Sequence, residues 1–511
     1  MFRFKMRQGV LRSLALPALA VIAIPALVFA VGESLIFFFC DVLPDPPGCE
    51  ISEGFGGGTL GCAPETPPTG PGVITVAGTT PADLDNAILA ANAATPGCSP
   101  TMIVFPANQT IRVSTTPKLL TANNVTILGY GATIRGDDMC SSTITNLPCT
   151  VSADCGCSQF TCTAGKCKCP TCAGALLDIR GHNVVLRDLH VRNSGNDNIR
   201  VQGPNAYNVT ISHVSSTGAV DDGISISNKC TPIDASLPPD DWVCTASSDF
   251  AAPHHVTVQY SFVAGNTRTM FVKANNPRTH PDNVSIYHNW FAKQWVRGPY
   301  IYKGQNVDFV NNVIEDWAEW GTKFGGTAAE NATGNMAYNI FRQNRDLVHH
   351  PEYPLGYAVE LGQYVDPQCR ASTTTCALRD PLPATCKYVV SDPNKNNQKK
   401  GFNLASEEVP GSVFTGTGVD HTNWYLGTAL WIVDGTHDVF PMPRVNTLHY
   451  YGDVEYEART RSGPCVLTAA QIAAWRAGQP ITCPRHPIDQ AYLDATTWCV
   501  NTDIPFRPAG L

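Results

Sequence analysis

Charged residues are scarce in this chain, and they leave no basic surplus. Only 15% of the 511 residues are Asp, Glu, Lys or Arg, and the net charge is −8. A protein whose main partner is nucleic acid usually carries a basic excess, so this balance argues against that partner. It does not exclude an acidic substrate, because the local charge of a cleft decides which ligands are attracted there.

Helical patterns are also lacking over most of the chain. Gly (42 residues) and Pro (39 residues) are abundant instead, and short runs of Val, Ile, Thr and Asn recur. This composition favours short β-strands joined by many turns. Two helices are predicted: one follows Thr80 as N-cap and Pro81 at its first position and runs to Ala94, and the other covers Thr468 to Ala477.

Cysteine is plentiful, and its number points to a compartment. Twenty cysteines predict disulfide bonds and therefore an oxidising environment. Basic residues near the N-terminus precede an apolar run from Leu14 to Val31. We therefore predict a signal peptide over residues 1–30 and a secreted protein that is not in a membrane after signal removal. Membrane anchoring by an uncleaved N-terminal segment is the alternative.

Changes in composition suggest the domain organisation. Residues 31–72 are predicted to be a linker rich in Pro, Gly and Cys, 73–345 a β domain, and 346–511 terminal coils with a disulfide-containing C-terminal extension. Eight cysteines between Cys140 and Cys172 predict a disulfide knot, placed in an insert over 139–173. A zinc site at Cys169 and Cys172 is the alternative for this insert.

A repeated pattern indicates how the β domain folds. Five segments begin in one register, with a polar residue before Val and alternating apolar residues after it. Three of the four gaps between successive starts are 23 to 28 residues long, and the fourth, of 47, holds two steps; the starts are Asn183, Asn208, His255, Asn283 and Asn306. Such a period, with strand–turn–strand units and no helix between them, predicts an all-β solenoid. The helix near Pro81 would cover its N-terminal end.

Charged residues recur at the same period. Asp197 precedes Asp221 and Asp222 by one coil, and Arg268 precedes Arg297 by another. Residues one period apart stack side by side in a solenoid, so we expect these five on one face. Carboxylates that close together repel unless a cation intervenes, and a hard divalent ion with oxygen ligands is a natural solution. The alternative is that these residues are ordinary loop aspartates and solvated arginines.

The repeat residues also resemble a known family. The landmark strands of the pectate lyases, which fold as a right-handed parallel β-helix, are similar in order and spacing to Asn196–Val201, Val209–His213, Val256–Tyr260 and Val284–Asn289. The resemblance extends from Val73 to Phe341 without the cysteine-rich insert. It implies a right-handed parallel β-helix and a polysaccharide lyase that cleaves polygalacturonate or pectin, with Ca²⁺ as cofactor.

The resemblance also implies roles for single residues. The base of the family is the first Arg of an RxPxxR motif and falls on Arg297, with Pro299 in place. A Lys that binds the substrate carboxylate falls on Arg268, and calcium ligands fall on Asp197 and Asp221. The second Arg of the motif is replaced by Tyr302, with Lys303 beside it, so these two are predicted to bind substrate.

The acidic ligand set of the family is incomplete here. Two further calcium-ligand positions hold Gly195 and Ser225. Calcium is therefore expected to bind weakly, to arrive chiefly with the substrate, or to use Asp222 instead.

The implied reaction is β-elimination. Neutralising the uronate carboxylate with Ca²⁺ and Arg268 would stabilise the charge that develops when the C5 proton leaves. An Arg base is credible only where its surroundings disfavour the charged guanidinium.

Two other functions remain open at this point. A polygalacturonase-like glycoside hydrolase would use the paired aspartates, although the Gly-His-Gly and Arg-Ile-Lys elements of that family have no match. A non-catalytic polysaccharide-binding β-helix is the other alternative. In each case we expect a monomer with an acidic polysaccharide as partner.

Overall fold

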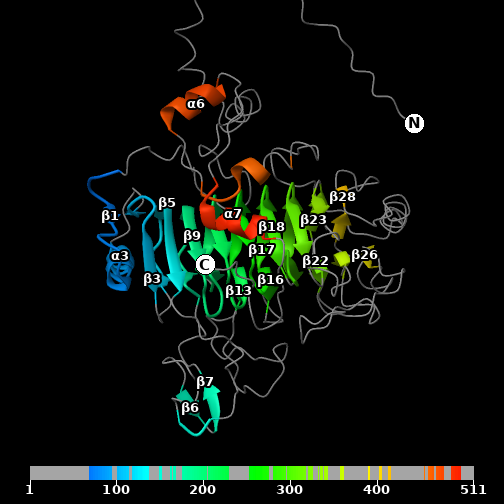
Figure 1. Cartoon of the computed structure of the whole chain (residues 1–511), viewed down its shortest axis with the longest axis horizontal. Coiled ribbons are helices and arrows are strands. Elements are labelled where there is room, and N and C mark those ends of the chain that lie inside the picture. The colour runs from blue at the N-terminus through cyan, green and yellow to red at the C-terminus, as the bar shows by residue number, and fades with distance from the viewer. Residues whose placement is uncertain are drawn as a thin grey trace, which may run out of the picture. The chain divides into compact units, whose positions relative to one another are not determined.

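The chain is built from parallel strands that stack coil upon coil. The computed structural model describes residues 68–94, 101–113, 118–136, 149–151, 161–163, 165–168, 175–203, 205–228, 252–274, 280–294, 296–317, 320–325, 332, 334–337, 339–342, 357–361, 390–391, 402–404, 413–415, 454, 458–464, 468–476 and 485–495. In this part, a 17-stranded and a 9-stranded sheet form, and every strand pair within them is parallel. Figure 1 shows the strands side by side in chain order. The predicted parallel β-helix is confirmed.

Three ladders of strands run along the solenoid, and most coils give one strand to each. The first ladder consists of β1 (Val73–Thr75), β2 (Thr101–Val104), β5 (Val125–Gly136), β9 (Val184–Arg192), β11 (Tyr207–Ser212), β14 (His254–Gln259), β17 (Asp282–Tyr287), β20 (Gln305–Val310), β23 (Gly334–Ala337) and β27 (Phe402–Leu404). The second consists of β3 (Thr110–Val113), the later halves of β5 and β9, β12 (Ser215–Thr217), β15 (Phe262–Ala264), β18 (Trp290–Gln294), β21 (Val313–Trp317), β24 (Ile340–Arg342) and β28 (Val413–Thr415).

The third ladder is the 9-stranded sheet, and it carries the site described below. It consists of β4 (Lys118–Leu120), β8 (Leu177–Ile179), β10 (Ile199–Gln202), β13 (Asp222–Asn228), β16 (Arg268–Ala274), β19 (Tyr300–Tyr302), β22 (Trp320–Gly325), β25 (Tyr357–Leu361) and β26 (Val390–Ser391).

The repeated Val of the sequence pattern forms a column in the core. Val184, Val209, Val256, Val284 and Val307 pair in register from coil to coil and are fully buried. Because Val209 pairs directly with Val256, the gap of 47 residues spans one coil, and the prediction that it holds two steps is wrong. Burying such a side chain contributes about 1.5–3 kcal/mol, so the column favours one register over the alternatives.

The polar residue before each Val has a backbone role. Asn183, Asn208, His255, Asn283 and Asn306 all adopt a left-handed φ between 51° and 54°. Asn and His tolerate this conformation better than most residues, and here it turns the chain into the first ladder.

Buried asparagines join neighbouring coils at the next corner. Asn312 Nδ2 donates to the carbonyl oxygens of Ile286 and Val310, each at 2.9 Å. Its Oδ1 accepts from the backbone N–H of Asn289 at 3.0 Å, and Asn339 repeats the contact one coil later. These stacked asparagines therefore serve as partners for backbone groups of the neighbouring coils.

Helix α3 (Pro81–Ala93) covers the N-terminal end of the core. Thr80 is its N-cap and forms a capping box with Asp83, as the predicted helix start requires. Leu84, Ile88 and Ala91 pack into the main hydrophobic core.

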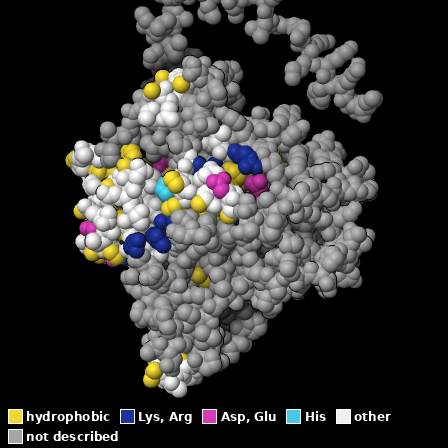
Figure 2. Space-filling view, in the orientation of Figure 1, with side chains coloured by type: hydrophobic (Ala, Val, Ile, Leu, Met, Phe, Trp, Pro, Cys, Tyr) yellow, Lys and Arg dark blue, Asp and Glu magenta, His cyan; other side chains and the backbone are white. Residues whose placement is uncertain are grey.

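The C-terminal segment supplies two further helices, α6 (Ala469–Arg476) and α7 (Pro487–Asp494). Helix α6 falls within the predicted Thr468–Ala477, whereas α7 was not predicted. Asp489 of α7 is buried and accepts from Ser215 Oγ at 2.5 Å. Figure 2 shows basic and acidic side chains gathered on the face where α7 lies in Figure 1.

The cysteine-rich insert is described in part. Strands β6 (Thr161–Thr163) and β7 (Lys166–Lys168) form an antiparallel pair, and Cys149 and Cys162 form a disulfide bond. The predicted signal peptide or anchor (1–30) and the predicted linker before residue 68 lie outside the described residues. Among the described helices, none has the length and apolar character needed to cross a membrane.

The asparagine ladder leads to a stability prediction. Replacing Asn312 by Ala removes the partners of several buried backbone groups. We expect the free energy of unfolding to fall by about 2–3 kcal/mol, because buried polar groups without partners are costly. Urea unfolding of both proteins measures the change.

The matched control for Asn312→Ala is Asn86→Ala, on the exposed side of α3. That substitution should change the stability by less than about 0.5 kcal/mol. Equal losses in the two variants would contradict the structural role of the ladder.

Candidate active site

The five charged residues that the sequence singled out enter the third ladder on neighbouring coils. Asp197 precedes β10, Asp221 directly precedes β13, and Asp222 begins β13. Arg268 begins β16, where it pairs in register with Asp222 on one side and with Val296 on the other. The structure thus brings together residues that are up to 100 positions apart in sequence.

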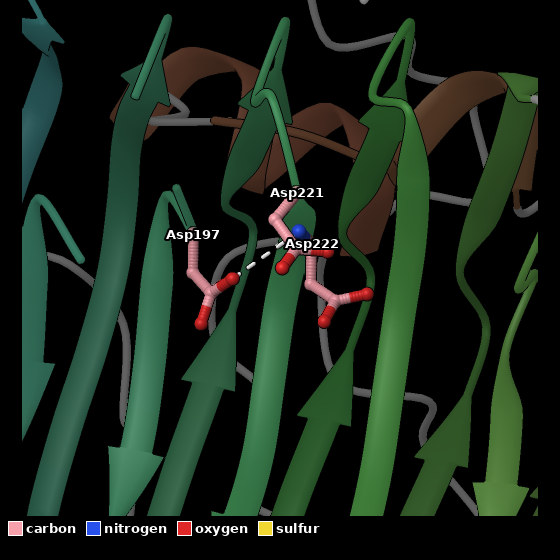
Figure 3. Close-up of side chains that lie close together, drawn as sticks. All are labelled: Asp197, Asp221 and Asp222. Carbon is pink, nitrogen blue, oxygen red and sulfur yellow. Dashed lines mark hydrogen bonds between the residues drawn. The ribbon is translucent and has the colours of Figure 1, made fainter. Parts of the chain in front are cut away.

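The three carboxylates form a compact group. One oxygen of each of Asp197, Asp221 and Asp222 lies within 4.8 Å of the others. The backbone N–H of Asp222 donates to Asp197 Oδ1 at 3.2 Å, and Figure 3 shows this bond between neighbouring coils. The side chains of Asp197 and Asp222 are almost wholly buried, whereas that of Asp221 is 30% exposed.

A guanidinium group pairs with each carboxylate. Arg268 Nη1 lies 2.5 Å from Asp221 Oδ1, and Arg297 Nη1 lies 3.0 and 3.1 Å from the two oxygens of Asp222.

The third pair was not predicted from the sequence. Arg200 of β10 donates to Asp197 Oδ2 through Nε at 2.7 Å, and its Nη2 lies 2.6 Å from the same oxygen. Three carboxyl groups and three guanidinium groups therefore meet in one place.

This arrangement separates the pKa values of the three acids. Burial raises the pKa of Asp197, although Arg200 acts in the opposite direction. Burial also raises the pKa of Asp222, to about 7, against the effect of Arg297. For Asp221, burial is outweighed by Arg268 and Arg297, so its pKa is lowered.

An aromatic pair supports Arg297. The guanidinium carbon lies 3.9 Å from the ring centre of Phe271, which stacks on Tyr300 with centres 5.1 Å apart. Phe271 and Tyr300 are register partners on β16 and β19. Contact with a ring face favours a cation and fixes the plane of the guanidinium.

Tyr302 and Lys303, also predicted to bind substrate, lie further along the strands. Tyr302 pairs in register with Lys273, five residues beyond Arg268 on β16. Lys303 Nζ lies 5.4 Å from the Tyr302 ring centre, and both residues are buried. The structure therefore places these two apart from the acidic group.

The acidic group fits a calcium ion in the kind of donor and in spacing. Calcium prefers carboxylate and other oxygen ligands, and it takes six to eight of them. The three aspartates supply converging oxygens. Ser225, at one of the positions where the family resemblance places a ligand, lies on β13 opposite Arg200 and carries no charge.

The comparisons with known proteins give a likeness to solved structures alone. No family model and no curated protein matches the sequence. A pectate lyase from Bacillus sp. N165 in complex with trigalacturonate is similar at 14% identity and a TM-score of 0.41, over 76% of this chain and 93% of that chain. A thermostable pectate lyase is similar at 12% identity and a TM-score of 0.42, over 78% and 93%.

A Bacillus subtilis pectate lyase variant is similar at 12% identity and a TM-score of 0.42, over 82% of this chain and 99% of that chain. Because these TM-scores are below 0.5, the fold of this chain is assigned from its own strand pairing and not from these likenesses.

The raised pKa of Asp222 leads to a prediction about pH and stability. The folded state binds a proton at Asp222 up to about pH 7, whereas the ordinary pKa is 3.8. This contribution to stability is present at low pH and is lost as the pH rises through 7. Between pH 5 and pH 8 we expect the native protein to lose about 2 kcal/mol more unfolding free energy than Asp222→Asn.

Denaturant unfolding at each pH measures the loss, and Asn86→Ala, on the exposed side of α3, is the control. It lies outside the acidic group and should follow the native protein over this range. If Asp222→Asn also follows the native protein, a raised pKa at Asp222 is excluded.

Proposed function

We propose that this protein binds an acidic polysaccharide at the acidic–basic cluster and cleaves polygalacturonate-type chains by β-elimination. One observation carries the proposal: Arg268 and Arg297 both approach a single carboxylate oxygen. Arg268 Nη1 lies 2.5 Å and Arg297 Nη1 lies 4.0 Å from Asp221 Oδ1. A substrate carboxylate near that position would be within reach of two cations.

The exposure of Arg268 and Arg297 indicates that a substrate carboxylate can reach both guanidinium groups from solvent. The side chain of Arg268 is 33% exposed and that of Arg297 is 16% exposed, whereas Arg200 is 7% exposed. Burial tends to lower the pKa of Arg268, but Asp221 and Asp222 outweigh it and raise the pKa. Arg268 is thus a permanent cation suited to binding the uronate C6 carboxylate.

The reaction itself needs a proton acceptor and charge stabilisation. The C5–H electron pair becomes the C4–C5 double bond, the C4–O4 bond breaks, and the departing oxygen takes a proton from water. Negative charge develops on the C6 carboxylate during this step, where Arg268 stabilises it.

Arg297 is the proposed acceptor of the C5 proton. A guanidinium must first give up a proton before it can accept another. Asp222 contacts Arg297 Nη1 through both carboxylate oxygens, so its ionised form, present above about pH 7, is placed to take that proton. Phe271 and the Asp222 carboxylate favour the cationic guanidinium, so this transfer is the costly step of the proposed reaction.

Calcium, when bound, would be held by Asp197 and Asp221, with Asp222 beside them, and would add to the neutralisation of the substrate carboxylate. Every other role in the proposed reaction is assigned to a side chain of this protein.

A glycoside hydrolase is the second candidate, and the pKa values favour it. Asp222 with its pKa raised to about 7 and Asp221 with a lowered pKa resemble an acid and a base. However, the carboxylate oxygens lie within 4.8 Å of one another, and an inverting hydrolase needs about 6.5–9.5 Å for its water. We therefore rank the hydrolase below the lyase.

The proposal includes export. The basic and apolar N-terminal sequence supports a secretory signal, and the Cys149–Cys162 disulfide fits an oxidising compartment. We propose that the protein acts outside the cell as a monomer.

Polygalacturonate tests the function directly. We expect ultraviolet absorbance from unsaturated uronide products when the protein is incubated with this polymer. Reducing ends without that absorbance would identify a hydrolase, and retention of the polymer without products would identify a binding protein. A chelator arm run in parallel measures how far calcium contributes.

Substitution of Arg297 tests the assigned base. Arg297→Ala and Arg297→Lys should each lower kcat by about 100-fold or more, because a positioned general base contributes that much. Initial rates of product absorbance measure the loss. Arg112→Ala, an exposed change on β3, is the control and should keep full activity. Full activity in Arg297→Ala would remove this residue from the mechanism.

Arg268 should act on substrate binding as well as on catalysis. Arg268→Ala removes a charge-assisted bond to the carboxylate, so we expect KM to rise about tenfold or more. Arg268→Lys keeps the cation and should recover part of the binding. An unchanged KM in Arg268→Ala would contradict the contact with substrate.

A further inference from the structure

Arg200 is the charged residue of the site that the proposed reaction leaves without a role. It lies in the middle of β10, between Ile199 and Val201, which are fully buried in the core. Since neighbouring side chains on a strand point to opposite faces, Arg200 points outward, toward the acidic group. Its side chain is nevertheless only 7% exposed.

The contacts of Arg200 hold its guanidinium against one carboxylate. Nε donates to Asp197 Oδ2 at 2.7 Å, and Nη2 lies 2.6 Å from the same oxygen. Nη2 also donates to Asn196 Oδ1 at 2.8 Å. Asp197 attracts the guanidinium strongly enough to outweigh the effect of burial, and the pKa of Arg200 is raised. Arg200 is therefore a fixed, permanent positive charge.

Both oxygens of Asp197 are already engaged. Oδ2 is taken by Arg200, and Oδ1 accepts the backbone N–H of Asp222 at 3.2 Å. A calcium ion bound to Asp197 would have to displace the guanidinium or lie close to it. Two cations that close repel strongly in a buried site, so the ion would lose much of its affinity.

Arg200 differs from the other two arginines of the cluster. Arg268 and Arg297 are more exposed and could transfer their contacts to a substrate carboxylate. Arg200 lies on the coil of Asp197 and is held there by a second partner, Asn196. Its register partner on β13 is the neutral Ser225, and its register partner on β8 is Asp178, which pairs with Arg180.

We propose that Arg200 is a built-in cation that neutralises Asp197 and keeps the affinity of the site for free calcium low. The protein then folds with its acidic group already neutralised and needs no divalent ion for stability. This arrangement would make the elimination less dependent on calcium. That consequence rests on the proposed lyase function. Calcium binding itself can be measured without substrate.

Titration calorimetry of the full chain with CaCl₂ alone tests the proposal. We expect the native protein to bind calcium weakly, with a dissociation constant of about 1 mM or higher, as in the weakest extracellular calcium modules. Arg200→Gln should bind at least about tenfold more tightly, because Asp197 is released. Arg200→Lys keeps the positive charge and should bind as weakly as the native protein.

Two further variants identify the carboxylate involved. In the double variant Arg200→Gln/Asp197→Asn the gain in calcium affinity should disappear. Arg112→Gln removes an exposed guanidinium of β3, outside the acidic group, and should leave calcium binding unchanged. Unchanged affinity in Arg200→Gln, or equal gains in the single and double variants, would overturn the proposal.

If Arg200→Gln is too unstable for calorimetry, thermal unfolding with and without calcium tests the proposal instead. Calcium should raise the melting temperature of this variant, or restore its folding, while leaving the native protein nearly unaffected. An Arg200→Gln protein that stays unfolded in saturating calcium would contradict the proposal, because calcium is then unable to replace the guanidinium. Lyase activity enters none of these measurements, so a failure here is distinct from a failure of the proposed function.

Discussion

The in-register backbone pairing of successive coils is the constraint on which the site depends. Arg268 donates its backbone N–H to Asp221 at 3.1 Å, and Met270 donates to Arg297 at 2.7 Å. These bonds fix which residue lies beside which, because a slip of one position would turn every side chain to the opposite face. The core valines and the buried asparagines oppose such a slip.

Charge balance is the second constraint. Three carboxylates within a few ångströms would destabilise the fold if they were left without partners. One arginine pairs with each carboxylate: Arg200 with Asp197, Arg268 with Asp221 and Arg297 with Asp222. Two of these cations remain partly accessible and are available to a ligand, whereas the third is committed to the structure. The same ion pairs thus serve folding and the proposed chemistry.

The sequence predicted the repeat and much of the cluster, because both follow from a period that is visible in the chain. Asp197 and Asp221 recur one coil apart, as do Arg268 and Arg297, so stacking places each pair together. The two pairs meet because β13 pairs directly with β16, which the 47-residue gap in the sequence did not predict. The alternation of Ile199, Arg200 and Val201 could also have shown that Arg200 points toward the acidic group. Its partner could not be foreseen, since that depends on how the side chain bends back to Asp197.

Other features have no signal in the local sequence. Phe271 meets Arg297 through a register that only the folded coils define. Asp489 meets Ser215 across 274 residues, where no period connects the two segments. Tyr302 and Lys303 were placed at the substrate by resemblance to a motif, and the strand register puts them further along the sheet.

A double-mutant cycle between Asp222 and Arg297 tests the central claim most directly. These residues are 75 positions apart and are predicted to touch solely because their coils stack in register. The unfolding free energies of the native protein, Asp222→Asn, Arg297→Gln and the double variant give the coupling between the two side chains. The structure predicts a coupling of about 1 kcal/mol or more at pH 8, as is usual for groups in one ion-pair network. A coupling indistinguishable from zero would contradict the shared cluster and the site built on it.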